Sequence, residues 1–351
     1  MSAITGILYR DGRKVNLKLI KKMNGTLSHR GPDGSAVYCK GSIGLGHQML
    51  HTTHESINEE LPFHGESSGL VITADARIDN RRELGEELNI EDNRDVPDSY
   101  FILKAYSKWG EKCPQYLLGD FAFAIWDENN EKLFCARDHM GVKPFYYYLS
   151  DDIFVFGTEI RALFCAEEVP KKLNEDMAAM FLMVINDNKS TFYENIYSFS
   201  PAHSLTIGGK INKKRKYWEL DKESQITMDS EEEYASKFQE LFAEAVECRL
   251  RSASTPGFEL SGGIDSSSVI CMAKKILKEK KGYKGKINSF SYTFNGFECD
   301  ESHYIKAVTD TGGIEPNFVS GNEISFLEGI EKILWYQEQP VSTPYIAIIW
   351  N

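Results

Sequence analysis

The stretch from Leu260 to Ser268, with the sequence Leu-Ser-Gly-Gly-Ile-Asp-Ser-Ser-Ser, decides the fold of the second half of the chain. Apolar Phe258 and Leu260 precede the two glycines, and apolar residues at helical spacing follow from Val269 to Leu277. This order predicts a strand, a tight loop and a helix. Glycine lets a backbone bend and approach a ligand, and a helix N-terminus attracts an anion. The loop is therefore suited to a pyrophosphate.

The polar side chains of this loop fit the same ligand. Ser261, Ser266 and Ser267 carry hydroxyl donors for phosphate oxygens, and Asp265 is a hard oxygen ligand suited to Mg²⁺. The alternative is a surface turn followed by a helix cap, since both residue types favour those places. No Lys follows the glycines, so the loop differs from the Walker pattern. It resembles the pyrophosphate loop of enzymes that split ATP into AMP and pyrophosphate.

The residues after this loop alternate between strand and helix patterns. Ile287 to Phe294 is typical of a strand, Tyr304 to Val308 of a helix, Phe318 and Val319 of a short strand, and Phe326 to Leu334 of a helix. Such alternation predicts a parallel α/β sheet whose ligands bind at the carboxyl ends of the strands. The glycine-rich loop lies at that position.

The first half has a different pattern. Ile4 to Tyr9 predicts a strand, and two hairpins are expected from Phe121–Trp126 with Leu133–Ala136 and from Pro144–Leu149 with Ile153–Phe156. Hairpins mixed with helical patterns predict antiparallel sheets covered by helices, an α+β domain.

Caps and turns mark further elements of the chain. Asp98 is expected to cap a helix that ends before Gly110, and Arg30 and Asp33 are expected to pair with each other or with backbone in a rigid turn. The charged segment after Lys210 separates two domains, 1–218 and 230–351, and Ser230 with its capping box opens the second.

Composition excludes several classes of protein. The chain has 351 residues, 42% hydrophobic, and a formal charge of −12, which disfavours binding to nucleic acid or to an anionic membrane. Seven scattered cysteines without a Cys-x-x-Cys pair indicate neither a disulfide framework nor a zinc site. No signal peptide or membrane span is visible, so we expect a cytoplasmic protein.

Together with the pyrophosphate loop, three further stretches resemble the asparagine synthetase family: His29–Gly34, Leu117–Ala124 and Arg137–Tyr147. The resemblance covers essentially the whole chain. It implies an N-terminal class II glutamine amidotransferase domain with the αββα sandwich of N-terminal-nucleophile hydrolases, followed by a Rossmann-like ATP-pyrophosphatase domain. In this family, glutamine supplies ammonia at the first site, and ammonia attacks β-aspartyl-AMP at the second.

The first site departs from the family pattern. The nucleophilic cysteine is replaced by Ser2, and the arginine that clamps the glutamine carboxylate aligns with Met49, which cannot form a bidentate charge-assisted bond. The Asn-Gly pair of the oxyanion hole aligns with Asp75 and Ala76, whose carboxylate would repel the oxyanion. Asp98, which aligns with the residue that holds the glutamine amino group, is kept. We therefore expect this site to be degenerate.

A degenerate first site is also found in a branch that includes β-lactam synthetases and lasso-peptide cyclases. The opening Met1–Ile7 and the run Ala74–Asn80 resemble that branch, with the lasso-peptide cyclases closest. The implied reaction uses ATP and Mg²⁺ to join a carboxylate of a small molecule or peptide to an amine of the same substrate, which closes a lactam or isopeptide.

The resemblance also assigns residues of the second site. Leu260 and Tyr292 are expected to line the adenosine pocket, Asp265 to ligate Mg²⁺, and four residues to hold pyrophosphate: Ser261, Gly262, Gly263 and Ser266. The family continues beyond the position of Asn351 with a second acidic loop and a helical half. Because the chain stops on the apolar run Tyr345–Trp350, we expect a truncated synthetase domain, with its C-terminal portion possible as a partner in trans.

Two alternatives stay open from the sequence. One is a glutamine-hydrolysing asparagine synthetase that converts aspartate to asparagine. The other is a non-catalytic fragment that binds nucleotide or peptide.

Overall fold

The structure is a computed structural model that describes residues 1–65, 68–90, 95–185, 187, 189–279, 285–323, 325, 327 and 329–341. The chain forms two compact units, Met1–Lys222 and Glu223–Asn351, which we describe separately. The apolar run Tyr345–Trp350 and Phe326 of the last predicted helix lie outside the described residues. No helix in the described ranges is both long and apolar enough to cross a membrane.

Unit 1 contains two six-stranded antiparallel sheets. In spatial order, the first sheet consists of β10 (Ile196–Ser198), β8 (Tyr146–Leu149), β9 (Ile153–Gly157), β1 (Ala3–Tyr9), β3 (Ile43–Met49) and β2 (Gly34–Lys40). The second consists of β12 (Ile211–Lys216), β11 (His203–Gly208), β7 (Lys132–Arg137), β6 (Gly119–Asp127), β5 (Leu70–Ile78) and β4 (Phe63–Gly65).

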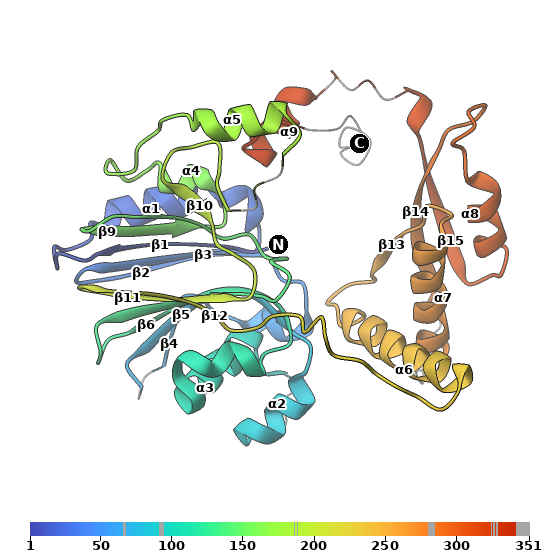
Figure 1. The fold of residues 1–351 in the computed structure, drawn as a ribbon, viewed down its shortest axis with the longest axis horizontal. Coiled ribbons are helices and arrows are strands. Elements are labelled where there is room, and N and C mark those ends of the chain that lie inside the picture. The colour runs from blue at the N-terminus through green and yellow to red at the C-terminus, as the bar shows by residue number, and fades with distance from the viewer. Residues whose placement is uncertain are drawn as a thin grey trace. The chain divides into compact units, whose positions relative to one another are not determined.

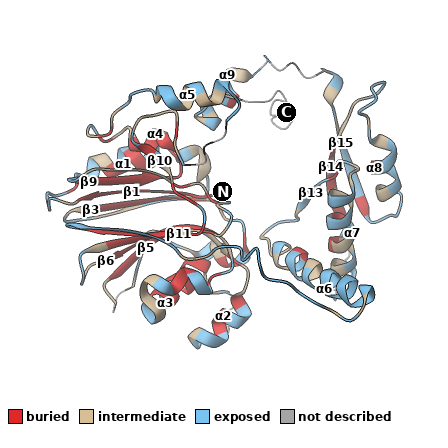
Figure 2. Ribbon diagram, viewed as in Figure 1, coloured by how far each residue is buried: buried red, intermediate tan, exposed pale blue. Residues whose placement is uncertain are grey.

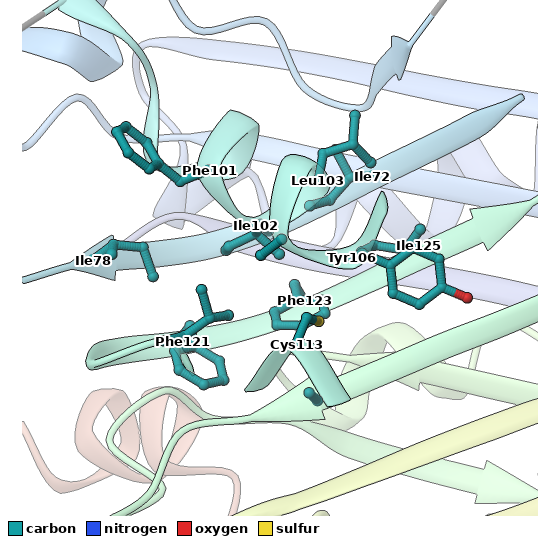
Figure 3. Close-up of a cluster of buried hydrophobic side chains, with 14 of the residues drawn as sticks. Ile72, Ile78, Phe101, Ile102, Leu103, Tyr106, Cys113, Phe121, Phe123 and Ile125 are labelled. Atoms are coloured by element: carbon teal, nitrogen blue, oxygen red, sulfur yellow. The ribbon is translucent and has the colours of Figure 1, made fainter. Parts of the chain in front are cut away.

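Helices cover the outer faces of both sheets, so unit 1 has the predicted αββα layers (Figure 1). The helices on the first sheet are α1 (Leu17–Gly25) and α4 (Ile160–Leu163), with α5 (Glu175–Leu182) beyond them; those on the second are α2 (Arg81–Leu88) and α3 (Asp98–Trp109). Figure 2 shows that burial follows the sheets and the helix faces turned toward them. Helix α3 places Phe101, Ile102 and Tyr106 against β5 and β6, where the core contains Phe121 and Phe123 (Figure 3).

The two predicted hairpins of unit 1 are present. β6 and β7 are joined by a turn in which Asp127 Oδ1 accepts hydrogen bonds from the backbone N–H groups of Asn129 (3.1 Å) and Asn130 (3.0 Å). An aspartate that satisfies backbone donors two and three residues ahead favours a tight turn. β8 and β9 form the second hairpin, so local turn chemistry was sufficient to predict both.

Strand β1 is the centre of the first sheet. All seven of its residues are buried, and it pairs antiparallel with β3 on one side and β9 on the other. Side chains of both pleat faces therefore enter cores, which explains the continuous apolar pattern of its sequence. The strand fixes the position of Ser2, the residue just before it.

Unit 2 contains the predicted parallel sheet, in the order β13–β14–β15. Its elements in chain order are α6 (Glu231–Arg249), β13 (Gly257–Glu259), α7 (Ile264–Glu279), β14 (Ile287–Thr293), α8 (Ser302–Thr309), β15 (Ile314–Ser320) and α9 (Ile330–Gln337). Ser230 caps α6, because its Oγ accepts a hydrogen bond from the N–H of Glu233 at 3.2 Å.

One local prediction was wrong, and a second was right for only one of its two residues. Helix α3 begins at Asp98 itself, with Pro97 at the cap position, so the Asp98 side chain is not the cap. Within the described ranges, the Arg30 side chain pairs with neither Asp33 nor the backbone of the turn; its Nε donates to the buried carboxylate of Glu159. The Asp33 carboxylate accepts a hydrogen bond from the backbone N–H of His51 at 2.7 Å, so for Asp33 the predicted pairing with backbone is confirmed.

Candidate active sites

Ser2 lies at the start of β1 with its hydroxyl held by backbone. The N–H of Leu50 donates to Ser2 Oγ at 3.0 Å, and Ser2 Oγ donates to the Leu50 carbonyl at 3.4 Å. The Met49 sulfur lies 3.9 Å from the same oxygen. A nucleophilic serine needs a base that takes its proton. Here both hydrogen bonds go to one backbone residue.

The residues predicted for the first site come together around one small cavity. Ser2, Met49, Asp75, Ala76 and Asp98 all line it; Ser2 directly precedes β1, and the others come from β3, β5 and α3. Its volume of about 30 Å³ is room for one or two water molecules. In this conformation the cavity does not admit a glutamine molecule.

The carboxylate of Asp75 forms an ion pair that sequence reasoning missed. Lys143 Nζ donates to Asp75 Oδ1 at 2.8 Å, and both side chains are buried, with residue exposures of 9% and 5%. The Asp75 Oδ2 atom has no hydrogen-bond partner within the described part of the chain. The position expected to donate to an oxyanion is thus a carboxylate neutralised by a lysine.

A loop held by Asp138 delivers Lys143 to this position. Asp138 Oδ1 accepts from the N–H groups of Met140 (3.1 Å) and Val142 (2.9 Å), and Oδ2 accepts from the N–H of Lys143 (3.0 Å). This loop belongs to the stretch Arg137–Tyr147 that carried the family resemblance. The only sequence signal for the ion pair is that resemblance, because the two partners are 68 positions apart.

The other acidic groups at the cavity are also engaged. Arg81, buried on α2, donates to Asp98 Oδ1 and, at 2.8 Å, to the carbonyl of Val96. Ser99 donates to Glu59, and burial raises the pKa of the Glu59 carboxyl to about 7. Burial also lowers the pKa of the Met1 α-amino group, against the opposing effect of Asp75.

In unit 2, the glycine-rich loop closes on itself through its own serines. Ser261 Oγ lies 3.1 Å from Ser266 Oγ and accepts from the N–H of Gly263 at 3.3 Å, while Ser266 Oγ donates to the carbonyl of Gly263 at 3.2 Å. Gly262 has φ +92°, and a Cβ there would lie 3.1 Å from Glu301 Cβ. The backbone conformation therefore favours glycine at position 262, and a Cβ there would also be tight against the start of α8.

The other residues predicted for the second site differ in exposure. Leu260 is 1% exposed and packs in the core of unit 2, while its carbonyl accepts from Ser291 Oγ at 2.7 Å. Tyr292 is half-buried on β14, and Asp265 is exposed in the first turn of α7. Among the described residues, no cluster of three or more His, Cys, Asp or Glu side chains could hold a metal ion.

Comparison with known proteins identifies the family. Residues 1–218 match the family described as glutamine amidotransferase domain, and residues 237–350 match asparagine synthase. The putative asparagine synthetase [glutamine-hydrolyzing] 2 of Methanocaldococcus jannaschii is 31% identical over 97% of this chain and 68% of its own length. The chain belongs to the asparagine synthetase family. This membership supports an ATP-dependent amide-forming ligase and confirms the predicted family.

Further relatives carry different names. Asparagine synthetase [glutamine-hydrolyzing] 3 of Bacillus subtilis is 30% identical over 97% of this chain and 57% of its own length. Amidase chry2 of Gibberella zeae is 27% identical over 95% of this chain and 51% of its own length. The chain therefore spans between about half and two thirds of these family members.

Proposed function

We propose that this chain is part of an ATP-dependent ligase that adenylates a substrate carboxylate and joins it to an amine of the same substrate. The supporting observation is the buried Asp75–Lys143 ion pair at the position where the family has an oxyanion donor. Because the amine and the carboxylate belong to the same substrate molecule, the product is a lactam or an isopeptide, as in lasso-peptide cyclases.

Two physical arguments count against glutamine hydrolysis at the first site. Loss of one oxyanion donor alone lowers a rate by about 10²–10³-fold, and Asp75 adds negative charge where the intermediate would develop it. Met49 offers only a thioether where a glutamine carboxylate needs a cation, and its sulfur already lies 3.9 Å from Ser2 Oγ. Under this proposal, unit 1 is a scaffold and a surface that holds substrate.

The second site supplies the proposed ATP chemistry. A carboxylate oxygen of the substrate attacks the α-phosphorus of ATP and pyrophosphate leaves; the amine then attacks the acyl carbon, AMP leaves and the amine loses a proton. The serines and backbone N–H groups from Ser261 to Ser266 would hold the pyrophosphate. Mg²⁺ commonly binds one or two carboxylates together with phosphate oxygens, and exposed Asp265 fits that role.

Pyrophosphate release from ATP tests this function. The chain is assayed with candidate precursor peptides, alone and with the C-terminal portion of a relative supplied in trans. We expect peptide-dependent release that Asp265→Asn abolishes and that the control Asp310→Asn, at the exposed C-cap of α8, does not abolish. No release under either condition would refute the proposal, and nucleotide binding without release would favour the non-catalytic fragment.

A second candidate is glutamine-hydrolysing asparagine synthesis, which is favoured by the hydroxyl of Ser2 in the cavity and by the names of two relatives. Glutamate formation from glutamine is compared between the unchanged chain and Ser2→Ala. Ser2-dependent glutamate formation would support this candidate and overturn the interpretation of Met49 and Asp75.

A further inference from the structure

Strand β12 forms an exposed edge of the second sheet of unit 1. β11 is the only described strand that pairs with it, and all six residues of β12 are exposed. An edge strand leaves every second backbone N–H and C=O group free to bind another strand. The proposed ATP chemistry does not use this edge.

The hydrogen-bond register identifies the free backbone groups of β12. Tyr217, one position beyond the strand, donates its N–H to the carbonyl of Ala202 at 2.9 Å, which continues the register between β11 and β12. Hydrogen-bonded pairs alternate along an antiparallel ladder, so the residues at 215, 213 and 211 direct their backbone groups to β11. The backbone groups that point away from β11 belong to the residues between them: Asn212, Lys214 and Lys216.

The same strand is strongly basic. Residues 210–216 include five cations and no acidic residue, in a chain whose formal charge is −12. Arg215 and Lys216 each pair with one glutamate, but Lys213 and Lys214 form no salt bridge within the described residues. The edge therefore carries positive charge that the described part of the protein does not neutralise.

Lys214 shows where a bound anion would lie. It is opposite Leu205, whose side chain packs in the core shared by the two sheets, and opposite residues of a ladder share one face. Its Nζ donates to Ser200 Oγ at 3.1 Å and lies 5.5 Å from the centre of the Phe199 ring. Burial and the nearby Lys189 ammonium lower the pKa of Lys214. An anionic group beside Lys214 would offset both effects.

An extended acidic peptide matches both the backbone and the charge of this edge. Its own backbone can pair with the free N–H and C=O groups of β12, and its alternate side chains would lie on the same face as Lys214 and Lys216. A nucleic acid or an anionic membrane could bind the cations but has no backbone that pairs with a strand. A second copy of β12 would place lysine beside lysine, and lysines on edge strands prevent such pairing.

We propose that β12 binds an acidic peptide segment in extended conformation, which adds to the second sheet as a further strand. Acidic side chains at alternate positions of this segment pair with Lys214 and Lys216. The strand and its cations all lie in unit 1, so the proposal stands whether or not the second site uses ATP.

Calorimetric titration of the full chain tests this surface, with an acetylated and amidated octapeptide of alternating glutamate and threonine as the ligand. Lys214→Gln combined with Lys216→Gln should weaken binding about threefold or more, since one exposed ion pair contributes a factor of about 1.4–5. The matched control is Lys18→Gln combined with Lys21→Gln, at exposed positions of α1. It removes the same charge and should bind as the unchanged chain does.

A second pair of variants tests the backbone pairing separately from charge. Asn212→Pro removes one outward N–H, leaves the bonds to β11 in place and should weaken binding about two- to tenfold. Asn212→Ala keeps that N–H and should bind as the unchanged chain does. In amide exchange followed by NMR, the peptide should protect the N–H groups of residues 212, 214 and 216, with little change at 213 and 215, which already bond to β11.

The peptide itself supplies the last control. N-methyl groups on two adjacent central residues block both edges of the peptide and should weaken its binding strongly. Equal affinity of this N-methylated peptide, or of an oligothymidylate with the same number of charges, would show a general polyanion surface and overturn the proposal. Failure of the acidic peptide to bind would overturn it too. Tighter binding after loss of Lys214 and Lys216 would show that these lysines only protect the edge, which also contradicts the proposal.

Discussion

Asp75→Asn changes the ion pair at the first site and at the same time returns the residue type that the family pattern has there. The substitution keeps the size of the side chain and an oxygen that can accept from Lys143. It removes the negative charge 2.8 Å from a buried ammonium group. The Lys143 ammonium is then left in a poorly hydrated site without a counter-charge.

The distance sets the size of the effect. Two unit charges 2.8 Å apart attract by about 6 kcal/mol at an effective dielectric constant of about 20, before desolvation is counted. Measured losses from breaking buried pairs are about 3–5 kcal/mol. Since domains are stable by about 5–15 kcal/mol, Asp75→Asn should remove a large share of the stability of unit 1.

Hydrogen exchange of peptides from β5 and β6 measures the opening free energy of unit 1 without interference from unit 2. Lys143→Met combined with Asp75→Asn removes both charges and should lie within about 1 kcal/mol of the unchanged chain. Since removing either partner alone should cost about 3–5 kcal/mol, the coupling energy of this cycle should be at least about 5 kcal/mol in magnitude. A loss below about 1 kcal/mol in the single variant Asp75→Asn would refute the reasoning. We expect no glutaminase activity in this variant, because Met49 still replaces the carboxylate clamp.

Three further predictions concern other residues. Gly262→Ala should lower the stability of unit 2, measured by denaturant unfolding, by about 1–3 kcal/mol, because Gly262 has a positive φ and lies close to α8. Gly263→Ala should cost less, because Gly263 has no positive φ and a Cβ there would meet only Ser261 Oγ, at 3.4 Å. Equal losses in the two variants would contradict this prediction. Burial raises the pKa of Glu59 to about 7, so the folded state favours the protonated carboxyl. The contribution of this carboxyl to the stability of unit 1 is therefore full below about pH 4.5 and is lost as the pH rises through about 7. Glu59→Gln should therefore gain up to about 3 kcal/mol relative to the unchanged chain between pH 4.5 and 8, and parallel stability–pH curves would exclude this effect. Arg81→Met removes the hydrogen bonds that Arg81 donates to Asp98 and to the Val96 carbonyl, and it should lower the stability of unit 1 by about 3–5 kcal/mol. The control Arg82→Met, at an exposed position, should change stability by less than about 0.5 kcal/mol. Similar losses in the two variants would show that the stability of unit 1 does not depend on the hydrogen bonds of Arg81.

Much of the fold could be predicted because its signals are local. The hairpin of β6 and β7 follows from an aspartate that satisfies nearby backbone donors, and the parallel sheet follows from alternating strand and helix periods. The cap of α6 by Ser230 is likewise local. In the turn and in the cap, the interacting groups lie within a few residues of each other.

The partners at the first site could not be predicted because they are distant in the sequence. Lys143 pairs with Asp75 across 68 positions, and Arg30 pairs with Glu159 across 129. Nothing local distinguishes these cations from others in the chain. For Asp98 a local signal was misleading. Aspartate commonly caps helices, so the sequence predicted a cap, but the Asp98 side chain instead accepts a hydrogen bond from Arg81.

The position of β1 has a consequence for how this protein could change over time. The ladders to β3 and β9 fix the chain just beyond Ser2, so the location of that side chain does not depend on its own reactivity. Mutational drift could thus erase the chemistry of the first site while its geometry stayed intact. One codon change to cysteine would present a thiol at the same point, which makes this scaffold a convenient starting material for laboratory evolution of a new acyl-transfer activity.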